Sequence, residues 1–581
     1  MMRNLMDRIK LPSFSFSFTT SPNELAMWQI IFLGVLVFVG CFYGMGSYAI
    51  LDMNEGLYAE VAREMLVNNH WLIPHLNGVE YLEKPPMLYW LMAISYKIFG
   101  INAFGARFIP SLATALTTLS FYFLGKKVGA ARTGWIAAIV MLSSLVFLII
   151  GRTVFFDPLF MFFISACLLS FYFSELYLAY AFLALAVLTK GVVVLILVPL
   201  ILIVYLGLMG ADKEQFRALL DRRAIILFLI IALPWHVLAS LWEPRFIWEY
   251  IINQQFLRFF NMSTPHDYHT GPLYFYIPRV LAYLAPWSLF LAFMFWPLRL
   301  KKPFDSLKAF LWSWFAVMFV FFSLSADKGD YYLIIGTPPL AYLIAQKIEE
   351  WVVADKAKWL SLVYALLLSV MVAAGVYALL SPGLIPPLYR SSVSFLVVMV
   401  IGFAVGGMYL CYRNRNNPLI PVLLFALLSV PCVSFYLNIK QASQYLYSQK
   451  ALAQFVKNEY QARSVYLYQD FEGFSSFVFY AGFPCPVVDS HSSDLHYGST
   501  LKSGKDEFLT LNDFFAKSKT QFLYLVMHTN DVSGFEQLPD AKPFCAVAQN
   551  KRVVLLSNSP EDCQAAVLSG DQKKFPDEIR H

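Results

Sequence analysis

Long apolar runs without Asp, Glu, Lys or Arg recur along this chain of 581 residues. Ala26–Tyr43, Ala224–Leu241 and Val393–Leu410 are three examples. A run of about 18 apolar residues is long enough to cross the hydrocarbon layer of a membrane as a helix. Charged residues make up only 14% of the chain, whereas a soluble globular protein carries roughly 25%. The sequence therefore predicts an all-α, polytopic membrane bundle.

Thirteen membrane spans are predicted from these runs. They lie near 27–46, 105–124, 133–151, 157–173, 176–190, 191–209, 224–241, 279–297, 309–325, 331–347, 359–380, 393–412 and 418–436. No short apolar segment with a cleavage site of small residues follows the N-terminus. We therefore expect the first span to be retained.

Short basic loops predict how these spans are oriented, because Lys and Arg favour the cytoplasmic side of a membrane. The basic groups are Arg3, Arg8 and Lys10; Lys126, Lys127 and Arg132; Lys213, Arg217, Arg222 and Arg223; Arg299, Lys301, Lys302 and Lys308; Lys347, Lys356 and Lys358; and Arg413 and Arg415. All fall on one side when the spans alternate. We expect a multi-pass protein of the bacterial inner membrane with a cytoplasmic N-terminus. The net charge of +6 forms no single stripe, so no nucleic-acid partner is expected.

The same pattern divides the chain into two domains. Residues 1–436 are predicted to form a transmembrane domain, whose outer segments 47–104 and 242–278 roof a site. Residues 437–581 are polar and are predicted to form a periplasmic α/β domain, because strand-like runs alternate there with helical patterns. The strand-like runs are Ser464–Tyr468, Gln521–Val526 and Arg552–Leu556.

The seven cysteines fall into two groups. Those in apolar spans, predicted to be buried thiols, are Cys41, Cys167, Cys411 and Cys432. Those in the polar C-terminal part are Cys485, Cys545 and Cys563. One disulfide is expected among these three if that part is periplasmic, and the spacing does not distinguish the pairs.

An amphipathic helix is predicted inside the segment 47–104. Its apolar positions at helical spacing are Tyr58, Val61, Ala62, Met65 and Leu66, and its opposite side holds Glu60, Arg63 and Glu64. Such a helix is expected to lie in the plane of the membrane interface. The stretch Pro86–Phe99 has a similar, mostly apolar character.

Polar and charged side chains gather in the outer segments of this topology. They are Asp52, Asn54, Glu55, Tyr58, Arg63, Tyr81, Glu83, Lys84, Arg152, Asp157, Lys190, His266, Asp267, His269, Lys328, Asp330 and Tyr332. Taken singly, each is explained as an ordinary solvated loop residue. Together they suit a phosphate leaving group held by cations and a carboxylate that deprotonates a nucleophile.

Several of these residues lie in strings that resemble one enzyme family. NEGLYAEVAREM at 54–65 is similar to the D-E-x-x-Y-A-E-x-x-R-E-M signature of the GT-C superfamily of lipid-linked glycosyltransferases, and YLEKP at 81–85 is similar to its Y-F-E-K-P. Further matching strings are FDP at 156–158, LTKG at 188–191, LPW at 233–235, HTGPLYFYIP at 269–278 and FFSL at 321–324. Within that superfamily the chain resembles the lipid A aminoarabinose transferases and the protein O-mannosyltransferases.

The resemblance implies a reaction and roles for single residues. It implies a GT-C fold and inverting transfer of a sugar from a polyprenyl-phosphate donor to lipid A or a related envelope acceptor at the periplasmic face. Lys84 would hold the donor phosphate, and Asp157 would be an acidic group at the sugar. Lys190, Lys328 and Tyr332 would assist Lys84. Tyr58, Tyr81 and Arg63 are also expected at the phosphate. Glu83 and His269 match positions that hold a divalent metal, expected to be Zn²⁺.

One position departs from the pattern. The first catalytic aspartate of the family falls at Asn54, and an amide is no general base at neutral pH. Asp52 or Glu55 would serve if the loop is shifted, or Asp157 acts alone. A phosphate acceptor is already ionised and needs positioning more than deprotonation, so Asn54 favours lipid A over a serine hydroxyl.

Other functions stay open. The acceptor would be a protein hydroxyl or another surface glycan if the chain is closer to the O-mannosyltransferases. A transporter of a lipid-linked sugar, which should show repeat symmetry and paired broken helices, and an inactive binding relative are the alternatives of another class.

Overall fold

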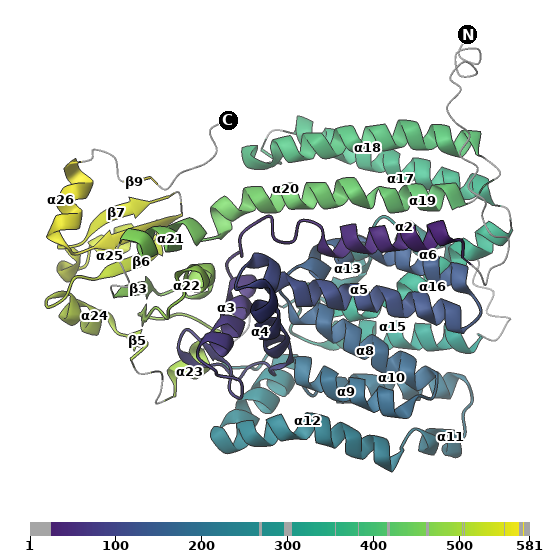
Figure 1. Cartoon of the computed structure of the whole chain (residues 1–581), viewed down its shortest axis with the longest axis horizontal. Coiled ribbons are helices and arrows are strands. Elements are labelled where there is room, and N and C mark those ends of the chain that lie inside the picture. Colours follow the sequence, from purple (N-terminus) through teal and green to yellow (C-terminus); the bar gives the residue numbers. More distant parts are fainter. Residues whose placement is uncertain are drawn as a thin grey trace, which may run out of the picture.

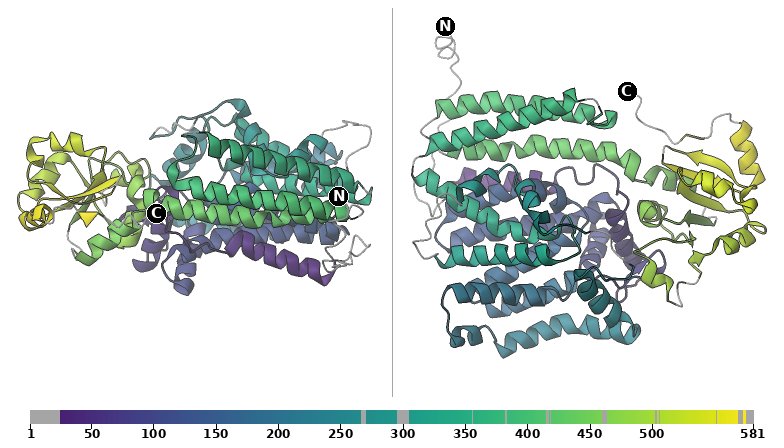
Figure 2. Two further views of the ribbon diagram at one scale, coloured as in Figure 1. Left: turned by 90° about the horizontal axis from the view of Figure 1, so that it is seen from above. Right: turned by 180° about the vertical axis from the view of Figure 1, so that it is seen from behind.

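Helices make up most of the chain. The computed structural model describes residues 25–265, 270–294, 305–354, 356–381, 383–414, 417, 419–459, 464–501, 504, 506–550, 552–568 and 573–574. A bundle of helices forms one part of the molecule, and a mixed α/β domain extends from one end of it (Figure 1). Helices α17–α20 lie along one edge of the bundle and α12 lies along the other (Figure 2).

Within the described residues, six helices are long and apolar enough to cross a membrane, or seven if one pair bent by 61° is a single span. The six are α5 (Ala103–Lys127), α12 (Arg222–Trp242), α15 (Ser306–Leu324), α17 (Ala357–Leu380), α18 (Pro387–Arg413) and α19 (Leu419–Leu427) joined to α20 (Ser429–Tyr447). The bent pair is α6 (Ala131–Leu142) with α7 (Leu145–Ile149) and η2 (Ile150–Arg152). Shorter apolar helices are α2 (Met27–Val37) with η1 (Phe38–Phe42), α4 (Met87–Phe99), α8 (Phe156–Tyr172), α9 (Leu176–Lys190) and α10 (Val194–Leu208).

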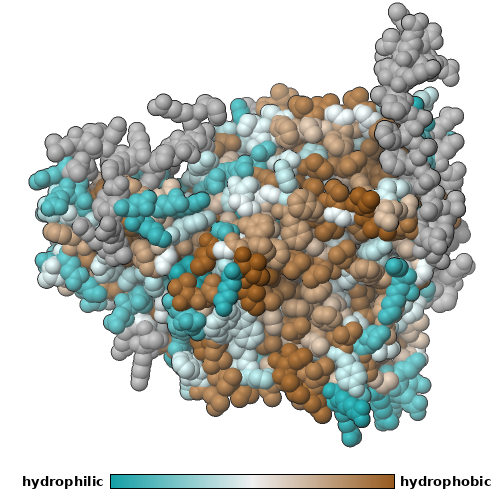
Figure 3. All heavy atoms as spheres, in the orientation of Figure 1, coloured by the Kyte–Doolittle hydropathy of each residue, from teal (hydrophilic) through white to brown (hydrophobic). Residues whose placement is uncertain are grey.

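Helices overlap all thirteen predicted spans, so the prediction of a mostly helical membrane protein is confirmed. Further helices between α10 and α17 are α11 (Lys213–Ala218), η3 (Trp248–Leu257), η4 (Leu273–Phe275), α13 (Tyr276–Tyr283), α14 (Leu289–Met294), η5 (Tyr332–Gly336) and α16 (Thr337–Val353). Apolar side chains cover most of the bundle on the face shown in Figure 3, and hydrophilic ones gather over the C-terminal domain. An exposed apolar surface of this kind is expected where helices contact the lipids of a membrane.

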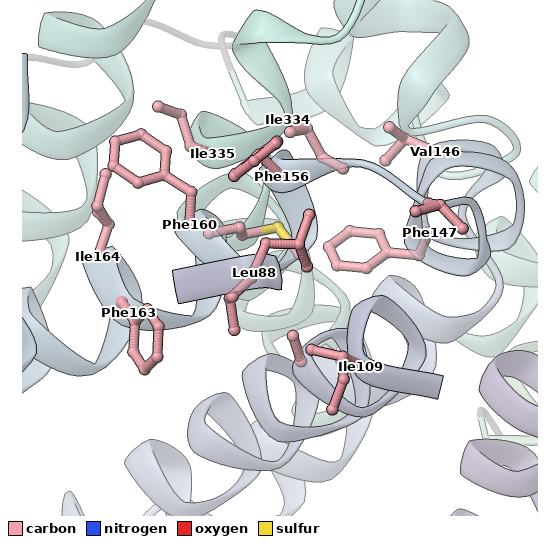
Figure 4. Packing of buried hydrophobic residues seen from close by; sticks show 14 of the residues in the cluster. Leu88, Ile109, Val146, Phe147, Phe156, Phe160, Phe163, Ile164, Ile334 and Ile335 are labelled. Carbon is pink, nitrogen blue, oxygen red and sulfur yellow. The ribbon is translucent and has the colours of Figure 1, made fainter. Parts of the chain in front are cut away.

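A tightly packed apolar core lies beneath the N-terminal end of α8. Phe156 and Phe160 of α8 pack with Leu88 of α4, Ile109 of α5 and Ile334 of η5 (Figure 4). These side chains are at most 9% exposed. Because protein interiors are close-packed, side chains anchored on this core are held in fixed positions.

The C-terminal domain contains a seven-stranded mixed sheet in the order β5-β4-β3-β6-β8-β7-β9. The strands are β3 (Val465–Tyr468), β4 (Val487–Val488), β5 (Phe508–Leu509), β6 (Tyr524–His528), β7 (Cys545–Gln549), β8 (Val553–Ser557) and β9 (Lys573–Lys574). Strands β3 to β6 are parallel, whereas β8 runs antiparallel to both β6 and β7. The three predicted strand runs overlap β3, β6 and β8, which confirms the predicted α/β character. Cys545 and Cys563 form the disulfide, and Cys485 is a buried free thiol.

The structure corrects one expectation about α3 (Asn54–Val67). The helix is present, but its charged side does not face water or headgroups: Glu60 and Glu64 are fully buried and Arg63 is 5% exposed. Helix α22 (Ser475–Ala481) of the C-terminal domain packs on α3, and Arg63 forms an ion pair of 2.6 Å with Glu60. A buried charge needs such a partner.

Gly56 lets α22 approach α3 closely. A Cβ at Gly56 would lie 2.5 Å from Ser475 Oγ and 2.7 Å from Ser476 N. Nothing larger than glycine fits there without moving the backbone of α22. The C-terminal domain is therefore fitted directly against α3.

Asp52 also joins the two domains. Its carboxylate accepts hydrogen bonds from Ser476 N at 3.0 Å, from Ser476 Oγ at 2.5 Å and from Gln449 Nε2 at 3.0 Å. Burial raises the pKa of Asp52 from 3.8 to about 7. The folded protein therefore holds this proton more tightly than the unfolded chain does.

We expect the stabilising effect of the Asp52 proton to be complete below about pH 4 and to be lost as the pH rises through about 7. The change Asp52→Asn keeps an acceptor for Ser476 and removes the titration. The thermal midpoint of the wild type should fall more than that of Asp52→Asn between pH 5 and pH 8, by on the order of 5 °C. The exposed Asp506→Asn serves as the control, and equal pH profiles for wild type and Asp52→Asn would contradict this assignment.

Candidate active site

Asp157 and Lys190 meet at the end of the bundle that faces the C-terminal domain. Asp157 lies in the first turn of α8, and Lys190 is the last residue of the neighbouring helix α9. Their side chains form an ion pair, in which Asp157 is 2% exposed and Lys190 19% exposed. A carboxylate at a helix N-terminus and an ammonium at a C-terminus also complement the helix dipoles. Asp157 is therefore held in place while Lys190 keeps an open side.

Lys84 lies in the loop before α4 and is half-buried. Within the described part of the chain, no acceptor forms a hydrogen bond or ion pair with its ammonium. Burial lowers the pKa of Lys84, and the nearby cations Arg258 and Lys190 lower it further. The nearby carboxylates Glu83 and Asp494 act in the opposite direction. A half-buried ammonium that lacks a hydrogen-bonded partner and has two further cations near it is a suitable place for an anion.

Arg258 and Tyr332 are held together by Asp327. Asp327 Oδ2 accepts hydrogen bonds from Arg258 Nε at 2.8 Å and from the Tyr332 hydroxyl at 2.7 Å. The ring of Tyr332 also lies 4.9 Å from the ammonium of Lys190. Asp327 is 3% exposed, so it positions one guanidinium and one phenol beside the cations without being open to water itself.

The C-terminal domain brings a further carboxylate, Asp494, to this site. The hydroxyl of Tyr81 lies 3.4 Å from Asp494 Oδ1 and 3.5 Å from Glu83 Oε2. Burial raises the pKa of Glu83 to about 8, and the neighbouring Asp494 contributes to the rise. Burial and the charge of Glu472 raise the pKa of Asp494 to about 6.

The structure thus brings together most of the residues predicted for the donor site. From the prediction these are Tyr81, Glu83, Lys84, Asp157, Lys190 and Tyr332, with Tyr58 packed between Phe156 and Tyr89 in the wall of the site. Arg258, Asp327 and Asp494 were not predicted. Arg258 lies in the predicted roof segment 242–278, within the string FLRFF at 256–260. A single cation among aromatic residues in that segment was a signal that could have identified it. Nothing in the local sequence around Asp494 marks it.

Four predicted residues are committed to structural contacts elsewhere. Glu55 forms an ion pair of 2.7 Å with the fully buried Arg107, and Asp52 binds α22 as described above. Arg63 is paired with Glu60. Lys328 is 4% exposed and donates to the carbonyls of Phe322 and Ser323 at the end of α15. Free carbonyls at a helix C-terminus are good acceptors for such an ammonium.

Asn54 is the first residue of α3 and is half-buried. Met53 before it has a φ of +65°, held by a hydrogen bond from its amide to Glu472 O and one from Ser475 Oγ to its carbonyl. A strained residue of this kind persists only where its surroundings hold it. The C-terminal domain therefore fixes where Asn54 lies.

The predicted metal site at Glu83 and His269 stays a prediction, because His269, like His266 and Asp267, lies outside the described residues. Among the residues that are described, no group of three or more His, Cys, Asp or Glu could hold a metal ion. Glu83 and Asp494 alone supply two carboxylates and no imidazole, an incomplete set for zinc.

The chain is similar to known membrane glycosyltransferases. A family model described as dolichyl-phosphate-mannose-protein mannosyltransferase matches residues 51–251. An undecaprenyl phosphate-alpha-4-amino-4-deoxy-L-arabinose arabinosyl transferase from Pseudomonas fluorescens is 29% identical over 453 residues, 74% of this chain and 76% of that protein. A protein of the same description from Serratia proteamaculans is 29% identical, over 63% of this chain and 68% of its own length.

The fold is that of a solved relative. The crystal structure of ArnT from Cupriavidus metallidurans bound to undecaprenyl phosphate matches with a TM-score of 0.81 at 21% identity, over 93% of this chain and 99% of that one. This likeness extends through both the helical bundle and the C-terminal domain. The chain is therefore a glycosyltransferase related to the undecaprenyl-phosphate aminoarabinose transferases, and its residues 51–251 match the mannosyltransferase family.

Proposed function

We propose that the protein transfers 4-amino-4-deoxyarabinose from undecaprenyl phosphate to a phosphate group of lipid A. The single observation that carries this proposal is the convergence of Lys84, Arg258 and Lys190, with the Lys84 ammonium lacking a partner among the described residues. A phosphodiester linking a polyprenyl chain to a sugar supplies the anion that this arrangement needs. The names of the relatives give the sugar, 4-amino-4-deoxyarabinose, and the carrier, undecaprenyl phosphate. Lipid A is the acceptor expected for this class of enzyme.

The cations suit the departing group better than the bound donor. An oxygen of the acceptor phosphate attacks the anomeric carbon of the sugar, and the bond from that carbon to the donor phosphate oxygen breaks. The donor phosphodiester carries one negative charge, and the polyprenyl monophosphate that leaves carries up to two. Lys84 and Arg258 therefore stabilise the transition state more than the ground state, which is the condition for catalysis.

In this proposal Asp157 lies beside the sugar, and Lys84 and Arg258 lie beside the donor phosphate. Positive charge develops on the anomeric carbon and ring oxygen as the donor bond breaks, as in other glycosyl transfers. The carboxylate of Asp157 is held by Lys190 and is positioned to stabilise that charge. No general base is needed when the acceptor oxygen is already ionised, which accounts for Asn54 at the position of the family aspartate.

An apolar groove next to the site provides room for the polyprenyl tail. Ile277, Leu281, Trp312, Phe315 and Phe319 line it between α13 and α15. Its start adjoins the loop that carries Asp327, because Tyr276 donates a hydrogen bond to Gly329 O at 2.9 Å. Each methylene of the tail that is buried there contributes about 0.8 kcal/mol to donor binding.

The site would face the periplasm. The disulfide between Cys545 and Cys563 belongs to an oxidising compartment, and it lies in the domain that supplies Asp494. Basic residues gather at the opposite end of the bundle, where Arg132 pairs with Glu349 and Lys127 with Glu175. This distribution follows the excess of Lys and Arg on the cytoplasmic side of membrane proteins.

The test of this function is transfer by the purified full-length protein in lipid nanodiscs, with a radiolabelled polyprenyl-phosphate aminoarabinose and lipid A. We expect labelled lipid A, confirmed by its increased mass. Label on a protein hydroxyl and none on lipid A would favour an O-mannosyltransferase-like reaction. Donor binding without any transfer would identify an inactive relative, and donor crossing vesicles without transfer would identify a transporter.

Restoring the family carboxylate tests the role given to Asn54. We expect Asn54→Asp to change transfer to lipid A by less than roughly threefold, because an ionised acceptor needs positioning and not a base. The same variant should fold at least as well as the wild type, since an acidic residue in the first turn of α3 favours the helix dipole. Initial rates with both proteins measure the effect, and a gain of tenfold or more would show that the wild-type site lacks a needed base.

A further inference from the structure

Asp327 and Gln254 both accept hydrogen bonds from Arg258, a cation near Lys84. The bond from Arg258 Nε to Asp327 Oδ2 is 2.8 Å long, and the bond from Arg258 Nη1 to Gln254 Oε1 is 3.3 Å long. Gln254 lies four residues earlier, in the π-helix η3, and is 9% exposed. The orientation of this guanidinium therefore depends on a neutral amide as well as on a carboxylate.

Glu249 determines which way the Gln254 amide points. Gln254 Nε2 donates a hydrogen bond to Glu249 Oε1 at 2.9 Å. A carboxylate accepts hydrogen bonds and a guanidinium only donates them. The amide nitrogen therefore faces Glu249 and the amide oxygen faces Arg258. The opposite orientation would set acceptor against acceptor at one end of the amide and donor against donor at the other.

The π-helical form of η3 brings these side chains together. A π-helix has hydrogen bonds between residues i and i+5, and such turns are frequent at functional sites. Glu249 accordingly accepts from Gln254, five residues later, and also from Asn253 Nδ2 at 2.9 Å, four residues later. Asn253 in turn accepts from Thr264 N at 2.8 Å and donates to Thr264 O at 2.6 Å. Glu249 is thus fixed by its own helix and by the segment that follows it.

A buried carboxylate at position 249 is costly by itself. Glu249 is 3% exposed, and the amides of Asn253 and Gln254 are its only donors among the described residues. It forms no ion pair with a described Lys or Arg. Burying a charge without a charged partner is unfavourable, so its effect on the Gln254 amide offers a reason for its presence.

A neutral amide between Glu249 and Arg258 also keeps the guanidinium available to a phosphate. Asp327 already places one negative charge on Arg258. A second carboxylate directly on Nη1 would compete with a phosphate for the same charge. Gln254 orients Nη1 without adding a charge of its own.

We propose that Glu249 and Gln254 are positioning residues, which hold the Arg258 guanidinium at the donor phosphate. This inference rests on the proposed function. Both residues act through Arg258 and take no part in bond breaking. Their effect should appear mainly in kcat, because the charge on the phosphate increases as the sugar leaves.

Glu249→Gln tests the orienting role, because it keeps the size of the side chain and allows the Gln254 amide to turn over. We expect kcat to fall by roughly 10- to 100-fold, the scale of a misplaced catalytic group, and the KM for the donor to change much less. Equilibrium binding of undecaprenyl phosphate, the product that carries the larger charge, should weaken by roughly tenfold. Gln254→Leu, which removes the link to Arg258, should show the same losses.

A double-mutant cycle separates the positioning of Arg258 from general support of η3. In an Arg258→Met protein, Glu249→Gln should change the affinity for undecaprenyl phosphate and the residual kcat by less than about twofold, since the group that it orients is gone. Glu243→Gln is the matched control, because Glu243 lies in the same roof segment and is paired with Arg245. Thermal unfolding checks that each variant is folded.

Two results would overturn the positioning role. One is wild-type kinetics and binding in both Glu249→Gln and Gln254→Leu, and the other is losses of the same size with and without Arg258. A wild type that binds undecaprenyl phosphate but transfers no sugar would instead overturn the proposed function. In that case the binding measurements of the cycle still decide whether Glu249 and Gln254 act through Arg258.

Discussion

Replacing Lys84 by Met should lower kcat/KM for the polyprenyl-phosphate donor by roughly 10²–10³-fold, the usual cost of removing one donor that stabilises a departing oxyanion. Lys84 is the one cation of the three whose ammonium has no carboxylate partner among the described residues, since Lys190 and Arg258 are each tied to an aspartate. Neither of the other two can replace it without breaking an existing ion pair. Most of the loss should appear in kcat, because the charge on the phosphate increases as the sugar leaves.

Initial rates with a radiolabelled donor measure this loss, and equilibrium binding of polyprenyl phosphate separates binding from turnover. Lys97→Met is the matched control, because Lys97 lies on the exposed face of α4, the helix that follows the loop of Lys84. The control should retain full activity. A Lys84→Met protein with wild-type kinetics would remove Lys84 from the phosphate site and leave Arg258 as the main contact.

Asp157→Asn should lower kcat by roughly 10²–10³-fold, the usual cost of removing one group that stabilises charge in the transition state. The amide keeps the size of the side chain and removes its charge, so positive charge that develops at the anomeric carbon is no longer stabilised. Lys190 loses its ion-pair partner and becomes a further cation near the donor phosphate. The KM for the donor should therefore stay the same or fall.

Single-turnover and steady-state rates together check this split between kcat and KM. Glu175→Gln is the control, since Glu175 is an exposed carboxylate at the other end of α8 and α9, paired with Lys127. A loss of donor affinity that parallels the loss of kcat would mean that Asp157 acts only by positioning Lys190. The Asp157→Asn protein must also unfold near the wild-type temperature for its rate to be interpreted.

The helical part of the fold was predictable from the sequence, because a chain that crosses a membrane needs long apolar runs and helices overlap every predicted run. The strands β3, β6 and β8 were predictable for a similar reason, since their buried faces require β-branched and aromatic residues in short runs. The fate of the charges on α3 was not predictable. Helix α22, which covers them, begins at Ser475, more than 400 positions further along the chain. No local sequence pattern indicates such a contact.

The candidate site was predictable only in part, because contacts between distant parts of the chain decide where its side chains lie. Lys84 and Asp157 lie in the strings YLEKP and FDP, which resemble those of the glycosyltransferase family, and the structure places both at one end of the bundle. Lys328 lies in an equally suggestive position, yet its side chain caps α15. The direction of a side chain depends on the acceptors within reach, which only the fold reveals. Asp494 came from the domain whose role the sequence left open.

The close fit of α22 at Gly56 has a consequence for recombination. Two stretches of the chain that lie far apart, 52–56 and 475–476, form one shape-matched joint. A C-terminal domain taken from a relative would bring its own helix against a mismatched counterpart, and would shift whatever carboxylate it carries away from Tyr81. These two stretches are therefore expected to be inherited as a pair, and a working chimera must exchange both.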